Sequence, residues 1–231
     1  MESNKRAIVI TGGSLVEAIT SDDLGRFDVL IAADSGVDAA HGLGLDPDVV
    51  VGDFDSVTQA ALDYARRAGA MVIPASRDKD FTDTELAIDH AASLGASHIT
   101  VVSSGGGRLD HTQGMVCSLA NPALRNIEVD AIIGVAHLSV LHGGDTRHIP
   151  RRGSEILALH AMHGPAEGIV TNGLRWNLND ETLQPWSSRG VSNQMTTAVA
   201  EIFLRSGVLA VIQPLAYDFP RHTKRMNGVF E

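Results

Sequence analysis

Residues 49–56 constrain this chain most, because a short β-branched run ends there in a glycine and two carboxylates. The run at residues 49–51 is typical of a buried strand in a parallel sheet. Gly52 follows it, and Asp53 and Asp55 come next at alternate positions. Open α/β sheets bind their ligands at the carboxyl ends of their strands. Two like charges held close together cost free energy unless a cation lies between them, and a hard cation such as Mg2+, bridging to phosphates, fits that position.

A plainer interpretation is that Asp53 and Asp55 only cap the following helix, because Asp is common at helix N-termini. Three further loops weigh against it, since each follows a strand-like run and carries a carboxylate: Asp34 after residues 29–31, Asp83 after 71–73 and Asp110 after 99–102. The carboxyl ends of parallel strands meet at one edge of a sheet. We therefore expect these acids to gather around one ligand site.

The first half of the chain alternates short apolar runs with amphipathic stretches, which is the βα rhythm of a parallel sheet. The strands are predicted at residues 7–11, 29–33, 49–51, 71–73, 99–102 and 127–133. Helices are predicted at residues 58–68, 82–94 and 111–119, the first ending at Gly69 and the second opening with a capping box, Thr82 and Glu85.

The rhythm changes beyond Gly134, where short strand candidates are separated by turn formers. These candidates are residues 138–141, 155–160, 167–171, 199–203 and 208–212. The pattern favours a small antiparallel sandwich or barrel. The sequence therefore predicts an α/β protein with an N-terminal Rossmann-like parallel-sheet domain at residues 1–133. A smaller antiparallel β-sandwich or barrel domain follows at residues 134–231.

The composition excludes several classes of partner. The 231 residues include 18 basic and 28 acidic side chains, for a net charge of −10, and no dense basic stripe. Nucleic acid and anionic membranes are therefore not expected as partners. The single cysteine rules out an intramolecular disulfide, which is consistent with a protein of a reducing compartment. No signal peptide or membrane-length apolar run is evident, so we expect a soluble cytoplasmic protein.

A glycine triplet, Gly105, Gly106 and Gly107, lies between a predicted strand and a predicted helix. Glycines let a backbone approach phosphates closely, and the helix start offers free N–H groups. Arg108 follows, and its guanidinium can pair two phosphate oxygens at once. Asp110 could bind a cation, orient Arg108 or cap the helix, and the sequence leaves these three roles open.

Four segments resemble, in order, motifs of the thiamine pyrophosphokinase family: A-D-S-G, P-D-V-V-V-G-D-F-D-S, K-D-F-T-D-T-E and G-G-G-R-L-D-H. The downstream segments G-L-R-W-N-L and V-S-N are similar to the thiamine-binding part of that family. The resemblance runs from about residue 34 to residue 214. It implies an enzyme that transfers pyrophosphate from ATP to the hydroxyethyl group of thiamine, giving thiamine diphosphate and AMP, with Mg2+ as its metal.

The resemblance also implies roles for particular residues. It assigns metal binding to Asp53, Asp55 and Asp83. Asp83 could instead only stabilise a helix, because an acid is favoured at a helix N-terminus. The catalytic set adds Asp34 and Arg108. The residues expected to contact ATP are Asp80, Thr82, Gly105, Gly106, Gly107, Arg108 and Asp110.

Thiamine brings a cationic thiazolium and a flat aminopyrimidine, for which an acidic cleft and an aromatic face are suited. The resemblance assigns that face to Trp176, while Ser192 and Asn193 are expected to hydrogen-bond the pyrimidine edge. A lone tryptophan is otherwise more often part of a core, and Ser-Asn is also ordinary turn chemistry. The resemblance further implies a homodimer, with thiamine held between one subunit's α/β domain and its partner's β domain.

Two other functions remain open at this point. One keeps the fold and the metal but transfers pyrophosphate to another heterocyclic alcohol, such as a hydroxymethylpterin. The other is a non-catalytic sensor of nucleotide or thiamine on the same scaffold. A sensor would be expected to lose some of the acids, but Asp34, Asp53, Asp55, Asp83 and Asp110 are all present.

Overall fold

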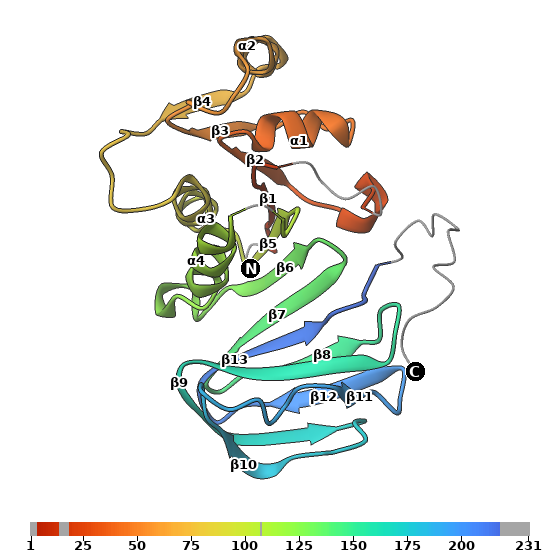
Figure 1. The fold of residues 1–231 in the computed structure, drawn as a ribbon. Coiled ribbons are helices and arrows are strands. Elements are labelled where there is room, and N and C mark those ends of the chain that lie inside the picture. Colours follow the sequence, from red (N-terminus) through yellow and green to blue (C-terminus); the bar gives the residue numbers. More distant parts are fainter. Residues whose placement is uncertain (1–3, 14–18, 107, 218–231) are drawn as a thin grey trace, which may run out of the picture.

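The computed structural model describes residues 4–13, 19–106 and 108–217, which form a mixed α/β fold around a large mixed sheet (Figure 1). Its parallel part comprises β1 (Arg6–Ile10), β2 (Val29–Ala33), β3 (Val49–Gly52), β4 (Met71–Pro74), β5 (His98–Ser103) and β6 (Glu128–Ile133). Their order in the sheet is β4-β3-β2-β1-β5-β6. The chain moves outward from β1 to β4 and then returns to the other side of β1, so a topological switch point lies between β1 and β5.

Helices cover both faces of this parallel part (Figure 1). They are η1 (Ser21–Leu24), α1 (Gly36–Gly42), α2 (Gln59–Ala68), α3 (Asp83–Ser93), α4 (Leu109–Leu119) and η2 (Pro122–Leu124). Ile88 of α3 and Leu119 of α4 pack on one face with Val9 of β1. Ala40 of α1 packs against Ile8 on the opposite face. The six predicted strands and three predicted helices are confirmed, whereas α1 was not predicted.

The second half is antiparallel and adds β7 (Ala136–His142), β8 (Thr146–Pro150), β9 (Ile156–Asn172), β10 (Asn179–Leu183), β11 (Asn193–Gln194), β12 (Val199–Phe203) and β13 (Ser206–Gln213). β7 pairs with β6, and the order beyond it is β13-β9-β12-β8, with β10 and β11 also paired to β9. The β8 and β10 strands were not predicted, because their sequences are mostly polar and contain no apolar run.

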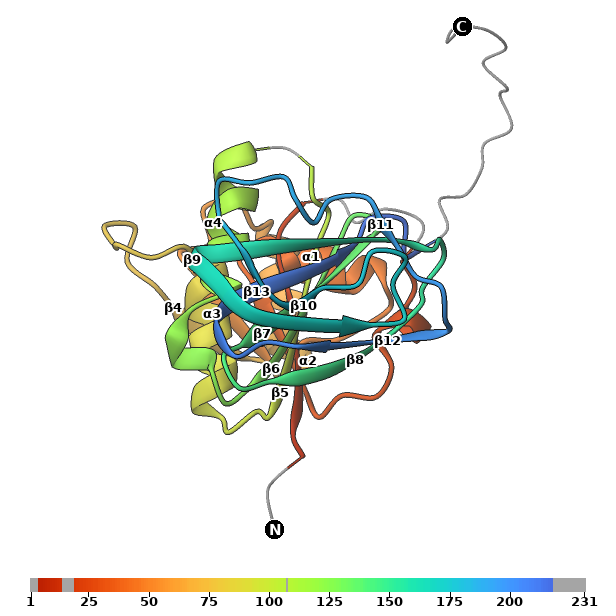
Figure 2. The same cartoon turned by 90° about the horizontal axis from the view of Figure 1, so that it is seen from below.

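The two strands predicted at residues 155–160 and 167–171 are parts of one long strand, β9. The first part of β9 pairs with β13 and the second with β10 and β12. A bend separates the parts, and His163 has a left-handed φ of 60° there (Figure 2). In the sequence, the Gly164-Pro165 pair predicts a break between two strands. In the structure, it lies where one continuous strand changes its pairing partner.

The predicted domain boundary at residues 133–134 falls in the turn between β6 and β7, where parallel pairing gives way to antiparallel pairing. The sheet nevertheless continues across that turn. Leu138 and Val140 of β7 and Ala210 of β13 also belong to the hydrophobic cluster under α3 and α4. The division into two domains therefore stays a prediction. None of the helices in the described part of the chain is long and apolar enough to span a membrane.

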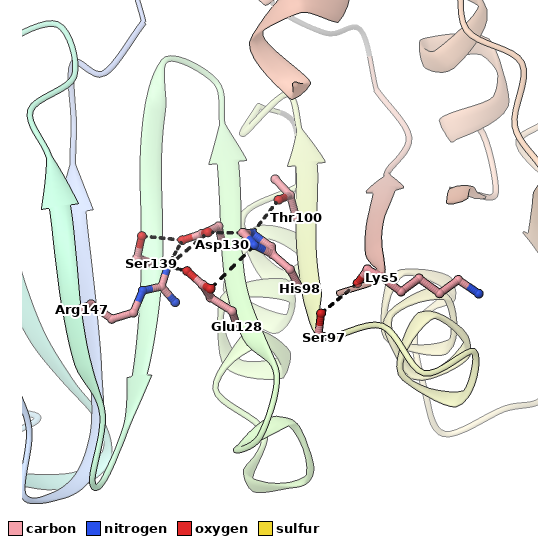
Figure 3. A network of polar contacts seen from close by, with 8 residues as sticks. All are labelled: Lys5, Ser97, His98, Thr100, Glu128, Asp130, Ser139 and Arg147. Carbon is pink, nitrogen blue, oxygen red and sulfur yellow. Dashed lines mark hydrogen bonds and ion pairs between the residues drawn. The ribbon is translucent and has the colours of Figure 1, made fainter. Parts of the chain in front are cut away.

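A buried polar network joins the two halves on the strands β5 to β8 (Figure 3). Asp130 of β6 pairs with His98 of β5, with 2.9 Å between Oδ2 and Nε2. Ser139 of β7 donates to Asp130 Oδ1 at 2.5 Å, and Arg147 of β8 donates to the same oxygen at 3.0 Å. Burial by itself raises the pKa of the Asp130 carboxyl, but the His98 hydrogen bond and the Arg147 charge outweigh it and hold that pKa well below its usual value.

His137, on β7 beside this network, is 7% exposed. Burial lowers its pKa from 6.5 to about 4, although the charge of Asp130 opposes the change. In the unfolded chain His137 therefore binds a proton below pH 6.5, whereas in the folded chain it binds one only below about pH 4. The free energy of unfolding should fall as the pH drops through that window.

We expect His137 to account for about 2 kcal/mol of stability lost between pH 7 and pH 5, from the linkage between proton binding and folding. Urea unfolding of the wild type and of His137→Gln at both pH values measures this loss of stability. The variant should have a flatter pH dependence, with an unchanged denaturant slope as the control for an intact fold. An equal loss of stability in the two proteins would contradict the assignment.

Candidate active site

A cleft of about 590 Å³ lies at the carboxyl ends of the parallel strands, around the switch point. Its wall includes residues at the ends of four strands, namely Thr11 after β1, Asp34 after β2, Asp53 after β3 and Ser103 at the end of β5. Arg108, which precedes α4, also lines it. The predicted convergence of strand-end loops on one site is thus observed for the loops after β2, β3 and β5. The loop between β4 and α3 completes the wall.

Three carboxylates meet at the centre of this wall. One oxygen from each of Asp34, Asp53 and Asp55 lies within 4.8 Å of the others. Gly52 allows this approach, because a Cβ at Gly52 would come within 3.2 Å of the Asp34 Cα. Asp34 and Phe54 both have a left-handed backbone, with φ of 48° and 61°. Such conformations cost free energy in non-glycine residues and cluster at functional sites.

The interpretation that Asp53 and Asp55 cap the next helix is wrong. The N-cap of α2 is Thr58, whose hydroxyl accepts a hydrogen bond from the backbone N–H of Ala61 at 3.2 Å. Asp53 Oδ1 instead accepts from the backbone N–H of Asp55 at 3.2 Å, so it stabilises its own turn. The other oxygen of Asp53 faces Lys79.

The loop before α3 brings a fourth carboxylate and a cation. Thr82 caps α3 by accepting from the backbone N–H of Glu85, and Asp83 is the first residue of the helix, where a negative charge is favoured. Lys79 Nζ lies 2.8 Å from Asp53 Oδ2 and 3.3 Å from Asp83 Oδ1. Lys79 thus bridges the loop after β3 to the start of α3.

These contacts shift the titration of the groups involved. The hydrogen bond from Lys79, followed by that from the Asp55 N–H, lowers the pKa of Asp53. Burial raises the pKa of Asp83, and Lys79 offsets part of that rise. The hydrogen bond to Asp53 in turn raises the pKa of Lys79. The cleft therefore holds Asp53 ionised beside a firmly protonated lysine.

The donor set fits a hard divalent cation. Asp34, Asp53 and Asp55 offer carboxylate oxygens, which such cations prefer. Asp34 Oδ1 is buried and makes no hydrogen bond, which leaves it free to bind a cation. Asp34 thus joins the predicted ligands Asp53 and Asp55 in this group, whereas the fourth acid, Asp83, lies outside it.

The glycine loop divides into residues with different surroundings. Gly105 packs against the β6–β7 turn, because a Cβ there would lie 2.8 Å from Ile133. Gly106 lines the cleft, and Gly107 lies outside the described residues. Arg108 also lines the cleft and pairs with Asp110 through two hydrogen bonds, of 3.2 Å and 2.5 Å. Of the three roles open to Asp110, the structure has it orienting Arg108.

Some predicted contacts differ from the observed wall, and some wall residues were not predicted. Asp80 is exposed and is not among the residues that line the cleft. Arg77, Lys79 and Phe81 do line it, although the sequence reasoning did not single them out. The signal available for Lys79 and Phe81 was their position in the segment K-D-F-T-D-T-E, next to the acids that the sequence does single out.

The three residues predicted to bind thiamine are grouped in the second half, apart from the residues lining this cleft. Asn193 is 6% exposed; its Oδ1 accepts from the backbone N–H of Trp176, and its Nδ2 donates to the Trp176 carbonyl. Trp176 is 54% exposed, and the Arg175 guanidinium lies 4.7 Å from its ring centre. Ser192 is exposed and has a left-handed φ of 61°. Asn193 therefore holds the Trp176 segment while the indole faces outward.

Comparison with known families gives two matches in sequence order. Residues 23–131 match the family described as thiamin pyrophosphokinase, catalytic domain, and residues 147–209 match the thiamin pyrophosphokinase, vitamin B1 binding domain. Together they cover most of the chain. The chain belongs to the thiamin pyrophosphokinase family.

Similar proteins carry the same family name. Thiamine pyrophosphokinase of Bacillus subtilis (strain 168) is 23% identical over 183 residues, which span 79% of this chain and 86% of that protein. Thiamine pyrophosphokinase 1 of Oryza sativa subsp. japonica is 28% identical over 59% of this chain, but only 54% of its own length is matched. The crystal structure of the Bacillus subtilis protein has a TM-score of 0.79 at 22% identity, covering 90% of this chain and 98% of that one, so the fold is shared.

The two thiamin pyrophosphokinase matches divide the candidate residues between them. The catalytic match includes every acid of the cleft together with Lys79 and Arg108. The vitamin B1 binding match includes Trp176, Ser192 and Asn193.

Proposed function

We propose that this protein is a thiamine diphosphokinase, which transfers the pyrophosphoryl group of ATP to the hydroxyethyl oxygen of thiamine and releases AMP. The observation that carries this proposal is the position of the acidic cleft at the switch point of the sheet, inside the matched catalytic region. Pyrophosphoryl transfer requires little covalent chemistry from the protein. It requires phosphates held in line and their charge neutralised, for which such a cleft is suited.

We propose Asp34, Asp53 and Asp55 as ligands of a magnesium ion, with Asp83 as the fourth acid assigned by the family resemblance. The clustered oxygens of Asp34, Asp53 and Asp55 support this role, as does the buried Oδ1 of Asp34, which makes no hydrogen bond. When bound, the ion would neutralise charge on the triphosphate as the β-phosphorus is attacked.

The chain's own cations complement these acids. Arg108, held by Asp110, presents a planar donor group at the mouth of the cleft and would pair with phosphate oxygens. Gly106 and the start of α4 would supply backbone N–H groups to the same phosphates. The hydroxyethyl oxygen of thiamine would form a bond to the β-phosphorus and lose its proton to solvent. The bond between the β-phosphorus and the oxygen bridging it to the α-phosphate would break, and AMP would leave with that oxygen.

We further propose that thiamine binds between two subunits of a homodimer. Each subunit would provide a catalytic domain at residues 1–133 and a thiamine-binding domain at residues 134–231. The separation of the two candidate groups supports this, because Trp176, Ser192 and Asn193 do not line the acidic cleft of their own chain. Trp176 would present its exposed face to the pyrimidine, with Asn193 fixing the backbone behind it. The cytoplasmic location stays a prediction.

Product analysis tests the reaction type. Incubating the protein with ATP, Mg2+ and thiamine should give AMP and thiamine diphosphate in equal amounts, measured by ion-pair chromatography. Hydroxymethylpterin in place of thiamine should give no AMP, which separates the two acceptor classes. ADP and thiamine monophosphate as products would contradict transfer at the β-phosphorus, and the absence of any transfer would favour the sensor alternative.

Neutralising Asp53 or Asp55 should lower turnover by about 100-fold or more, because a neutral amide is a poorer ligand for a hard cation. The Asn variants can keep the turn, since an amide oxygen also accepts a hydrogen bond from the Asp55 N–H. Asp63→Asn on α2 removes the same charge from an exposed position and is the matched control. Near-normal turnover in Asp53→Asn and Asp55→Asn would rule out their role as metal ligands.

The shared site can be tested by complementation. Asp55→Asn and Trp176→Ala should each be nearly inactive, Trp176→Ala because it loses the stacking face for the pyrimidine. After subunit exchange, each mixed dimer should contain one doubly defective site and one intact site, and regain about half the wild-type activity per dimer by simple site counting.

Mixing Asp53→Asn with Asp55→Asn is the control, because both defects then lie in catalytic domains and no site is intact. Subunit exchange is monitored by mass spectrometry of differently tagged chains. If exchange is complete and the first mixture stays inactive, each site is built within one chain.

A further inference from the structure

Lys79 connects two carboxylates that the proposed function requires for metal. Its Nζ lies 2.8 Å from Asp53 Oδ2 and 3.3 Å from Asp83 Oδ1. The three side chains are only 13–20% exposed, so solvent screens these ion pairs less than it would on an open surface. In the part of the chain that the structure describes, Lys79 is the one basic residue paired with the acids of the cleft wall.

The other basic residues of the wall have different surroundings. Arg108 is engaged by Asp110 and is largely exposed. Arg77 lines the cleft and acts on Asp53 only through its charge at longer range. The repulsion between Asp53 and Asp83 is therefore relieved directly by Lys79.

We propose that Lys79 is the resident counter-ion of the metal-free cleft: its ammonium group occupies oxygens of Asp53 and Asp83 that a divalent cation needs, and it transfers to the triphosphate when the cation and ATP bind. This inference rests on the proposed function and assigns a positioning role to a residue outside the acidic set.

The side chain has room for such a movement. Lys79 lines the acidic cleft and also a second cavity of about 490 Å³, whose wall includes Ile73, Pro74 and Leu86. A lysine is a compact charge on a flexible four-carbon stem, so it can change partners by rotating its side chain without moving the backbone. The stem can slide along this apolar wall while the ammonium group stays in the polar cleft.

Two opposite effects follow for a variant that lacks the charge. Without Lys79 the two carboxylates lose a competing cation, so a metal ion alone should bind more tightly. The triphosphate loses a positive partner, so nucleotide should bind more weakly. A residue that only stabilised the loop would weaken both.

Lys79→Met keeps most of the stem and removes the charge. Binding of Mn2+ to the nucleotide-free protein, measured from the electron paramagnetic resonance signal of free Mn2+, should be about tenfold tighter than in the wild type, the scale set by removing one unit charge a few ångströms from the ion. Calorimetry with ATP at saturating Mg2+ should show an affinity about tenfold weaker, because one charge contact to phosphate is lost. Circular dichroism checks the fold, and Lys79→Gln serves as a second variant.

Arg77→Met is the matched control, because it removes the same charge from the same loop without breaking an ion pair with Asp53 or Asp83. It should change Mn2+ affinity by less than Lys79→Met. Equal Mn2+ affinity in the wild type and both Lys79 variants overturns the proposal, as does equal tightening by Arg77→Met. Product analysis of the wild type decides the proposed function separately, since Mn2+ binding requires no turnover.

Discussion

Mutual repulsion among carboxylates is the constraint on which the candidate site depends. The parallel arrangement of β2 and β3 brings Asp34, Asp53 and Asp55 together at one sheet edge, and α3 begins with Asp83 beside them. Such an arrangement is stable only if positive charge enters it. In the protein alone that charge is the ammonium group of Lys79, which explains its two ion pairs. The same excess of negative charge prepares the cleft for a metal ion.

Backbone geometry makes this close approach possible. Gly52 has no Cβ to meet the Asp34 backbone, and Gly36 has none to meet the carbonyl of Ile10, which a Cβ would approach to 2.1 Å. The loops after β1, β2 and β3 can therefore crowd around one cleft. The left-handed conformations of Asp34 and Phe54 are a local cost of that crowding, offset by the buried sheet beneath. Rigid strands thus hold the charged loops at fixed separations.

In the second half, one exposed tryptophan lies on a segment that a buried side chain holds in place. Asn193 uses its amide to fix both backbone groups of Trp176, so the indole is exposed on a restrained segment. The sheet that carries this segment continues from the parallel part through β6 and β7, and the Asp130 network, with Arg147, ties the two parts across the turn. This continuity limits how a chain can bring its own Trp176 to its own cleft, and it is therefore compatible with the proposed homodimer.

The sequence alone determined the parallel strands, the helices α2 to α4 and the convergence of acids, because apolar periodicity and strand ends are local signals that a parallel sheet converts directly into position. Tertiary structure alone decided the contacts between residues that lie far apart in the sequence. The pairing of Lys79 with Asp53 and the two hydrogen bonds between the Asn193 amide and the Trp176 backbone depend on segments far apart in the sequence folding against each other. Likewise, β9 continues through Gly164-Pro165 because β13 and β12 supply hydrogen-bond partners on either side of the bend, and those partners lie far away in the sequence.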